Sequence, residues 1–170
     1  PRVFDWPSNA MFERVSLQQI FERIESLLGV MVPAQLTLVG GASKISDFKP
    51  MFGELFYERL TGCDFWGHVQ EDMFLGDLRA FLDDRTLLNH DTISPLLAPC
   101  FNAGPFMVYR NSAPIRSLFR RSRQWREVAT DPMYMAFDEW WGAQLIDHMP
   151  ALIEREHRAA RLRAYVAAPE

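Results

Sequence analysis

Residues 64–69 constrain the fold more than any other segment of this 170-residue chain. They form a short apolar and aromatic run, with Gly62 before it and a polar corner at residues 70–72 after it. A short apolar run bounded by turn residues is typical of a strand buried within a sheet. A helix predicted over residues 50–60, with Pro50 in its first turn, precedes this strand. Helix, short loop and strand in this order predict an α/β fold built on crossover connections.

The other elements follow from periodicity and from turn residues. Residues 16–28 predict the clearest helix, because Ser16 and Gln19 have capping-box spacing and apolar residues recur on one face. Gly29 ends this helix as a C-terminal cap. Together the predicted elements form one domain over residues 1–170. They further comprise strands at 2–6, 91–94 and 106–109, a loop at 40–43, an apolar stretch at 30–39 that fits a strand or a loop, helices at 77–89, 113–121, 123–129 and 137–147, and a last helix at 150–166 within the C-terminal part, 150–170.

Composition limits the class of protein. Of the residues, 48% are hydrophobic, which is enough for one core, and the formal net charge of −4 argues against nucleic acid as a partner. Cys63 and Cys100 lack metal-ligand spacing and are predicted to be buried, reduced thiols. No apolar run reaches bilayer-spanning length and no signal peptide is recognisable, so we expect a soluble, cytoplasmic protein. The chain begins at Pro1 within a predicted strand, as expected for a domain that lacks its first strand and helix; processing of the chain would give the same pattern.

The polar corner at residues 70–72 is the first candidate site. Gln70, Glu71 and Asp72 directly follow the predicted strand, at the edge where open α/β sheets bind ligands. A hard divalent ion takes carboxylate oxygens together with phosphate oxygens of a substrate. Asp77 lies close enough in the sequence to support the same corner. The alternative interpretation is a solvated acidic turn.

Three further groups of polar residues are candidates. Asp47 and Lys49 precede a predicted helix, where they either cap it or contact the ribose and phosphate of a nucleotide. Asp138 and Glu139 lie between aromatic residues, which raise a carboxyl pKa by desolvation and suit acid–base chemistry; the alternative is an acidic first helical turn. Arg110 ends a predicted strand, where it either holds a phosphate or an acidic partner in the crevice or forms a structural ion pair.

Five segments occur in an order and spacing that match a known pattern: residues 44–50, 64–68, 72–78, 106–111 and 136–139. On these segments the chain resembles a bacterial family of GT-A-like proteins, itself similar to the DXD-type glycosyltransferases that act on capsular and lipopolysaccharide glycans. The resemblance implies a GT-A-like fold, a mixed sheet flanked by helices. It also implies a nucleotide-diphospho-sugar as donor and a divalent metal, Mn²⁺ or Mg²⁺.

The resemblance implies a metal corner at residues 70–72. Asp72 matches the second acid of the DXD motif, and Gln70 stands where the first acid is expected. An amide oxygen is a neutral ligand, so this corner is weaker for a hard cation than a pair of carboxylates. Glu71 is adjacent, but neighbouring side chains on a strand point to opposite faces, so Glu71 is not expected to replace the missing acid.

The resemblance also gives roles to other candidates. Asp47 and Lys49 match positions on the donor side, and Asp138 and Glu139 match the acidic pair near the reaction centre; Arg110 remains a candidate phosphate contact. The expected function is metal-assisted transfer of a sugar from a nucleotide-diphosphate donor to a glycan or lipid-linked acceptor, with peripheral membrane contact as an option. Two alternatives stay open. One is a non-catalytic descendant of the fold that binds a glycan or a protein, and the other is a metal-dependent phosphohydrolase.

Overall fold

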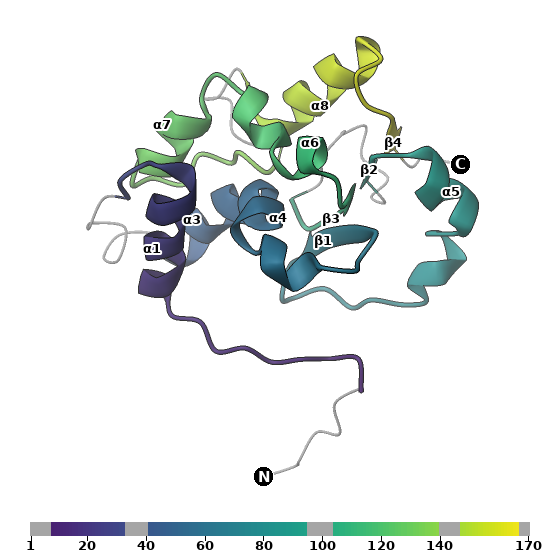
Figure 1. The fold of residues 1–170 in the computed structure, drawn as a ribbon, viewed down its shortest axis with the longest axis horizontal. Helices are drawn as coiled ribbons and strands as arrows, with labels where there is room; N and C mark the ends of the chain where they lie inside the picture. The colour runs from purple at the N-terminus through teal and green to yellow at the C-terminus, as the bar shows by residue number, and fades with distance from the viewer. Residues whose placement is uncertain (1–7, 33–40, 95–103, 140–146, 167–170) are drawn as a thin grey trace.

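The fold is a mixed α/β arrangement around a four-stranded sheet. The computed structural model describes residues 8–32, 41–94, 104–139 and 147–166. Its strands, in the spatial order β1-β3-β2-β4, are β1 (Phe65–Val69), β2 (Thr92–Ser94), β3 (Phe106–Arg110) and β4 (Ala164–Val166). β3 is antiparallel to both β1 and β2, whereas β4 is parallel to β2. The predicted mixed sheet flanked by helices is therefore confirmed (Figure 1).

Helices lie on both sides of the strands. In Figure 1, α1, α3, α4 and α7 lie to the left of the strands and α5 lies to their right. The helices are α1 (Leu17–Leu28), α3 (Gly41–Phe48), α4 (Phe52–Leu55), α5 (Asp84–Asn89), α6 (Ala113–Arg116), α7 (Trp125–Thr130) and α8 (Met149–Arg158). Short 3-10 turns join them: η1 (Lys49–Met51), η2 (Tyr57–Leu60), η3 (Leu78–Ala80) and η4 (Leu118–Arg121).

The prediction for α1 is confirmed in detail. The Ser16 hydroxyl accepts from the Gln19 amide at 3.1 Å, and the Gln19 side chain accepts from the Ser16 amide at 2.7 Å. Gly29 closes the helix in the left-handed region, at φ 67°, where a residue without Cβ is favoured. The strands predicted at 91–94 and 106–109 are confirmed as β2 and β3. The helices predicted at 77–89, 113–121 and 123–129 are confirmed as shorter helices and 3-10 turns.

Two segments predicted from local signals fold differently. The loop predicted at 40–43 is wrong from Gly41 onward, because α3 begins there. Glycine and serine are weak helix formers, and the packing of fully buried Phe48 at the end of α3 outweighs that preference. The helix predicted at 50–60 is divided into η1, α4 and η2, because the chain leaves helical geometry at Phe56 (φ −121°, ψ 26°).

The predicted C-terminal helix is also corrected. α8 ends at Arg158 instead of continuing to 166, since Ala160 takes a left-handed conformation (φ 56°) and residues 164–166 form β4. Residues 137–139 form a turn rather than the start of a helix. Three predicted segments lie outside the described residues. They are the strand at 2–6, residues 33–39 of the apolar stretch and residues 140–146 of the helix predicted at 137–147.

β1 is an edge strand, not the fully buried strand that its composition predicts. Its residues alternate between buried and exposed, and Trp66 faces the main core. Gly67 allows β3 to approach closely, because a Cβ at this position would lie 2.3 Å from the Met107 carbonyl oxygen. The pairing with β3 is antiparallel, with Val69 opposite Phe106, so the predicted crossover connection is wrong at this point. The last residue of β1 and the first residue of β3 therefore lie side by side, and the ends of the two strands form one edge of the sheet.

The hydrophobic core lies on both faces of the sheet. On one face Met107 and Tyr109 of β3 pack in the larger cluster with residues of α1, α3, α7 and α8. On the other face Phe106 and Val108 pack in a smaller cluster with Ile93 of β2. Cys63 is exposed, contrary to its predicted burial, and Cys100 lies outside the described residues. Among the helices described, none is long and apolar enough to cross a membrane.

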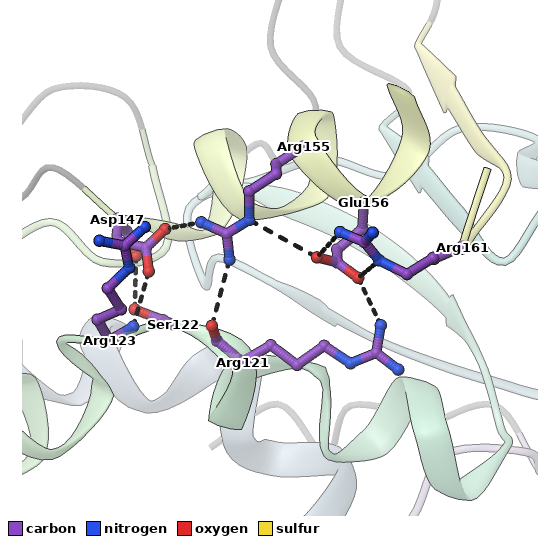
Figure 2. Close-up of polar contacts among 7 residues, drawn as sticks. All are labelled: Arg121, Ser122, Arg123, Asp147, Arg155, Glu156 and Arg161. Atoms are coloured by element: carbon purple, nitrogen blue, oxygen red, sulfur yellow. Dashed lines mark hydrogen bonds and ion pairs between the residues drawn. The ribbon is translucent and has the colours of Figure 1, made fainter. Parts of the chain in front are cut away.

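Arginine–carboxylate contacts hold α8 against the rest of the fold (Figure 2). The Glu156 carboxylate accepts from Arg121 of η4 at 2.5 Å and from two nitrogens of Arg161 at 2.8 Å. Arg155 pairs with Asp147 and donates to the Arg121 carbonyl oxygen at 3.2 Å. The arginine hydrogen bonds lower the pKa of Glu156 to about 2, although burial opposes them.

Replacement of Glu156 by glutamine is expected to destabilise the fold by about 2 kcal/mol at pH 7, because charge-assisted bonds to two arginines become neutral ones and solvent partly screens both arginines. The carboxyl pKa is lower in the folded chain than in the unfolded chain, so the stabilisation is present above pH 4.3 or so and is lost as pH falls towards about 2. Urea unfolding at several pH values measures this. A difference between wild type and Glu156→Gln that stays constant from pH 7 to pH 3 would contradict the assignment.

Candidate functional site

A polar pocket of about 380 Å³ opens at the sheet edge where β1 ends and β3 begins; we call it the edge pocket. The main chain closes this edge through the Gln70 amide, which donates to the Pro105 carbonyl oxygen at 2.8 Å. Three segments far apart in the sequence contribute its lining. The lining residues are Ile45, Ser46, Lys49, Gln70, Glu71, Tyr134 and Glu139.

Lys49 lies between the edge pocket and a buried acid. Its ammonium donates to Asp138 Oδ2 at 3.1 Å and to the Gly104 carbonyl oxygen at 3.0 Å. Gly104 lets both carboxylates approach the main chain, because a Cβ there would lie 2.9 Å from Asp138 Oδ2 and 2.7 Å from Glu139 Oε2 and would displace them. Desolvation raises the pKa of Asp138 to about 6, while the Lys49 charge acts in the opposite direction. Asp138 is therefore ionised for the most part at pH 7, yet more basic than an ordinary aspartate.

Tyr134 connects the two acids of the 138–139 pair. Its hydroxyl lies 2.6 Å from Glu139 Oε1 and 3.3 Å from Asp138 Oδ1. Burial and the hydrogen bond to Glu139 raise the phenol pKa far above its ordinary value, so Tyr134 stays protonated and donates to Glu139. Asp138 is buried and Glu139 lines the edge pocket. Of the two predicted acids, Glu139 is thus the one that a ligand in the pocket meets.

Asp47 is fully buried and is occupied by protein donors on both oxygens. Oδ2 accepts from Lys44 at 2.9 Å and from the Met135 amide at 2.9 Å, and Oδ1 accepts from the Phe137 amide at 2.9 Å. Lys44 has no exposed side-chain surface. Asp47 therefore supports the wall of the edge pocket from behind and has no surface with which to contact a donor nucleotide, the role that the resemblance implies.

Lysine use in this chain is unusual. The sequence has two lysines, Lys44 and Lys49, among its 18 basic residues. Both are buried and each is paired with an aspartate. An ammonium is a compact point charge, whereas a guanidinium is a broad planar group, so lysine suits these narrow buried positions. Both lysines come from the short segment 44–49, which forms one side of the site.

The polar corner after β1 differs from the sequence expectation. Residues 70–72 form a turn, closed by the Met73 amide donating to the Gln70 carbonyl oxygen at 3.2 Å, so the alternation of a strand does not apply. Gln70 and Glu71 both line the edge pocket, whereas Asp72 lies outside the lining; Glu71 and Asp72 are both exposed. Glu71 is therefore available to a ligand in the pocket, although the sequence argument had set it aside. Asp77 accepts from the Arg79 amide at 3.0 Å and caps η3.

Arg110 lies at the opposite end of β3 from the edge pocket. Because β1 and β3 are antiparallel, the C-terminal end of β3 is beside Phe65 at the start of β1. Arg110 pairs with Asp91 at 3.0 Å and donates to the carbonyl oxygens of residues 87, 88 and 90, which end α5. The predicted place of Arg110 in the crevice is corrected, and the structural ion pair is the interpretation that its contacts fit.

The structure also adds residues that the sequence argument missed. Tyr134 precedes a known candidate, Asp138, by four residues, but residues 131–139 contain no regular element, so this spacing carries no signal. Ser46 lines the pocket from α3, a helix that the sequence did not predict. Lys44 did have a signal in the sequence, because the chain has only two lysines and they lie five residues apart, Lys44 and Lys49.

The donor set of the edge pocket fits a hard cation that shares its ligands with a substrate. Across the described ranges, no group of three or more His, Cys, Asp or Glu side chains is arranged to hold a metal. Mg²⁺ needs one or two carboxylates when phosphate oxygens and water complete its shell. Glu71 and the amide oxygen of Gln70 supply oxygen atoms of this kind to the pocket lining.

Taken together, fold and site define a mixed α/β protein with a polar, acid-lined pocket at one sheet edge. The chain belongs to the family described as "Family of unknown function (DUF6625)", which matches residues 2–159. No curated protein matches the chain. No solved structure matches it either.

Proposed function

We propose that this chain is a GT-A-like sugar transferase that binds a nucleotide-diphospho-sugar in the edge pocket. The observation that carries the proposal is the meeting of Gln70 and Glu71 with Lys49 and Glu139 around one pocket of about 380 Å³. Oxygen donors for a hard cation, together with an ammonium for phosphate, are what a diphosphate requires. The resemblance of five ordered segments to DXD-type transferases supports the same proposal.

Glu71 and Gln70 are the residues that would hold a divalent metal, Mn²⁺ or Mg²⁺, together with phosphate oxygens of the substrate. A metal bound there supplies positive charge that neutralises the diphosphate leaving group. Glu71 then takes the carboxylate role that the resemblance gives to Asp72, because Glu71 lines the pocket and Asp72 does not. Lys49 holds a phosphate oxygen while Asp138 keeps its ammonium in place.

Glu139 is the residue that would meet the acceptor. Its Oε1 is oriented by the Tyr134 hydroxyl at 2.6 Å. Glu139 accepts the proton of the acceptor hydroxyl as that oxygen bonds to the sugar carbon. The bond between sugar and phosphate breaks, and its electrons remain on the nucleoside diphosphate. Asp138 acts through Lys49 because it is buried behind the pocket wall. A glycan or lipid-linked acceptor, a cytoplasmic location and contact at a membrane surface belong to this proposal.

A matched pair of variants tests which acid serves the site. Mn²⁺ together with the diphosphates of uridine, guanosine, cytidine and adenosine is expected to raise the melting temperature of the wild-type chain. Glu71→Gln is expected to weaken that binding by about tenfold or more, and Asp72→Asn is expected to leave it unchanged. Thermal shift identifies the nucleotide and calorimetry gives the affinities. The proposal fails if no diphosphate stabilises the chain in a metal-dependent way, and the role of Glu71 fails if Asp72→Asn has the larger effect.

A second candidate is a binding protein of the same fold without catalysis. It is favoured by Gln70 in place of an acid and by the Lys49 ammonium, which already has two protein acceptors. Transfer or hydrolysis of the nucleotide-sugar that binds best separates the two. Release of nucleoside diphosphate that depends on Glu139 supports the enzyme, and tight binding without any turnover supports the binding protein.

A further inference from the structure

We infer that Asp47 is a positioning residue: its buried carboxylate binds the main chain on both sides of Ala136 and thereby holds Tyr134 and Glu139 at the edge pocket. This inference rests on the proposed function for its meaning, since it concerns the wall of that same pocket. Asp47, to which the resemblance gives a position on the donor side, thereby takes a role behind the pocket wall.

The geometry around Ala136 is a main-chain anion site filled by the protein itself. Ala136 has φ 54°, a left-handed conformation that residues with a Cβ rarely adopt. A left-handed residue within a turn makes the neighbouring amides converge, and such converging amides bind anions. Here the Met135 and Phe137 amides both donate to the Asp47 carboxylate at 2.9 Å. The bound carboxylate thus stabilises a backbone conformation that is costly without it.

Lys44 binds main-chain carbonyl oxygens on the N-terminal side of the same turn. Its ammonium donates to Asp47 at 2.9 Å, to the Val128 carbonyl oxygen at 2.6 Å and to the Met133 carbonyl oxygen at 3.0 Å. The segment that leads from α7 to the turn is therefore fixed at Val128 and Met133 by Lys44, and at Met135 and Phe137 by Asp47. Lys44 and Asp47, which make all of these contacts, lie three residues apart on α3.

Main-chain positions that Lys44 and Asp47 anchor lie next to residues that line the edge pocket. Tyr134 stands between two anchored positions, Met133 and Met135, and contributes its hydroxyl to the pocket wall. Asp138 and Glu139 directly follow the anchored Phe137. Ser46, one residue before Asp47, lines the pocket from α3. A shift of the turn would therefore move Tyr134 and Glu139 relative to Gln70 and Glu71 on the opposite wall.

Variants at two positions separate positioning from general stability. Asp47→Asn retains one acceptor oxygen but points an amide donor at the second site, so one of the two main-chain amides loses its partner. Ala136→Val disfavours the left-handed conformation with the carboxylate intact, whereas Ala136→Gly accepts that conformation at no cost. Ile93→Val and Ile93→Ala are destabilised controls in the separate core cluster on the other face of the sheet. Of these two controls, the one whose free energy of unfolding is closer to that of Asp47→Asn is used for comparison; it is called the matched Ile93 variant.

The first readout needs no ligand. In Asp47→Asn and Ala136→Val we expect faster hydrogen exchange of the amides at 135 and 137, together with shifted NMR signals of Tyr134 and Glu139. In Ala136→Gly and in the matched Ile93 variant these signals are expected to stay at their wild-type positions. Wild-type signals of Tyr134 and Glu139 in a folded Asp47→Asn variant would overturn the inference.

The second readout is affinity for Mn²⁺ with the nucleoside diphosphate that stabilises the wild type most. We expect Asp47→Asn and Ala136→Val to weaken it by about 10- to 100-fold, and the matched Ile93 variant to retain it. Equal affinity in Asp47→Asn and wild type would overturn the inference even if stability falls. If the wild type binds no diphosphate while the ligand-free signals move as expected, the proposed function fails and the positioning role stands.

Discussion

Replacement of Lys44 by methionine is expected to destabilise the chain by about 3–5 kcal/mol, because it leaves a buried carboxylate without its counter-charge. The Lys44 side chain is 0% exposed, and so is that of its partner Asp47. Methionine nearly preserves the length of the stem, so the change removes the ammonium with little change in packing. The free energy of unfolding in urea measures the effect, provided that the slope of the transition is unchanged.

A double variant shows whether the loss comes from the stranded charge. Lys44→Met with Asp47→Asn is expected to be more stable than Lys44→Met alone, because the asparagine carries no charge and still accepts one main-chain amide. Arg85→Met, at an exposed position of α5, is the control for removing a cation and is expected to stay within about 0.5 kcal/mol of wild type. A loss in Lys44→Met that is no larger than in Arg85→Met would contradict the account of a buried ion pair.

Replacement of Lys49 by methionine is expected to cost about 3 kcal/mol at pH 7 and clearly less at pH 5. Without Lys49, which lowers the pKa of Asp138, the pKa of that carboxyl rises above its value of about 6. The folded chain then binds a proton more tightly than the unfolded chain, whose aspartate has a pKa near 3.9 or so. Protonation therefore favours folding, and stability is regained as pH falls from the raised pKa towards about 4.

The pH dependence of this loss identifies its cause. Lys49→Met with Asp138→Asn removes the carboxyl that titrates, so the gain in unfolding free energy that Lys49→Met shows between pH 7 and pH 5 is expected to be largely absent from the double variant. Urea unfolding of the three chains at both pH values provides the comparison. The explanation is wrong if Lys49→Met loses the same free energy at pH 5 as at pH 7, or if the double variant keeps the full pH dependence.

Local signals were sufficient for the parts of the fold that depend on neighbouring residues. The capping box at Ser16 and the glycine at 29 define α1 without help from the rest of the chain. The apolar runs at 64–69 and 106–109 predict β1 and β3, whereas the mixed sheet with flanking helices was implied by the resemblance. These elements are specified by periodicity and by caps, which act within a few residues.

Strand direction and long-range pairing were beyond such signals. The run at 64–69 does not indicate that β1 pairs antiparallel to β3, and this pairing moves Arg110 to the far end of the sheet. Nor does local sequence indicate that residues 70–72 form a turn, which brings Glu71 into the pocket. The expected pocket residues Lys49, Gln70 and Glu139 do meet, because contacts across 89 positions, such as Lys49 with Asp138, assemble the site.

The most direct measurement of the central claim is paramagnetic broadening by Mn²⁺ in the NMR spectrum of the full chain, with a nucleoside diphosphate present. Signals of Ser46, Gln70, Glu71 and Glu139 are expected to broaden first, and those of Asn111, beyond the far end of β3, are expected to stay sharp. Mg²⁺ in excess should restore the broadened signals. Broadening centred on another part of the chain, or none at concentrations that saturate thermal stabilisation, would contradict a nucleotide-diphosphate site in the edge pocket.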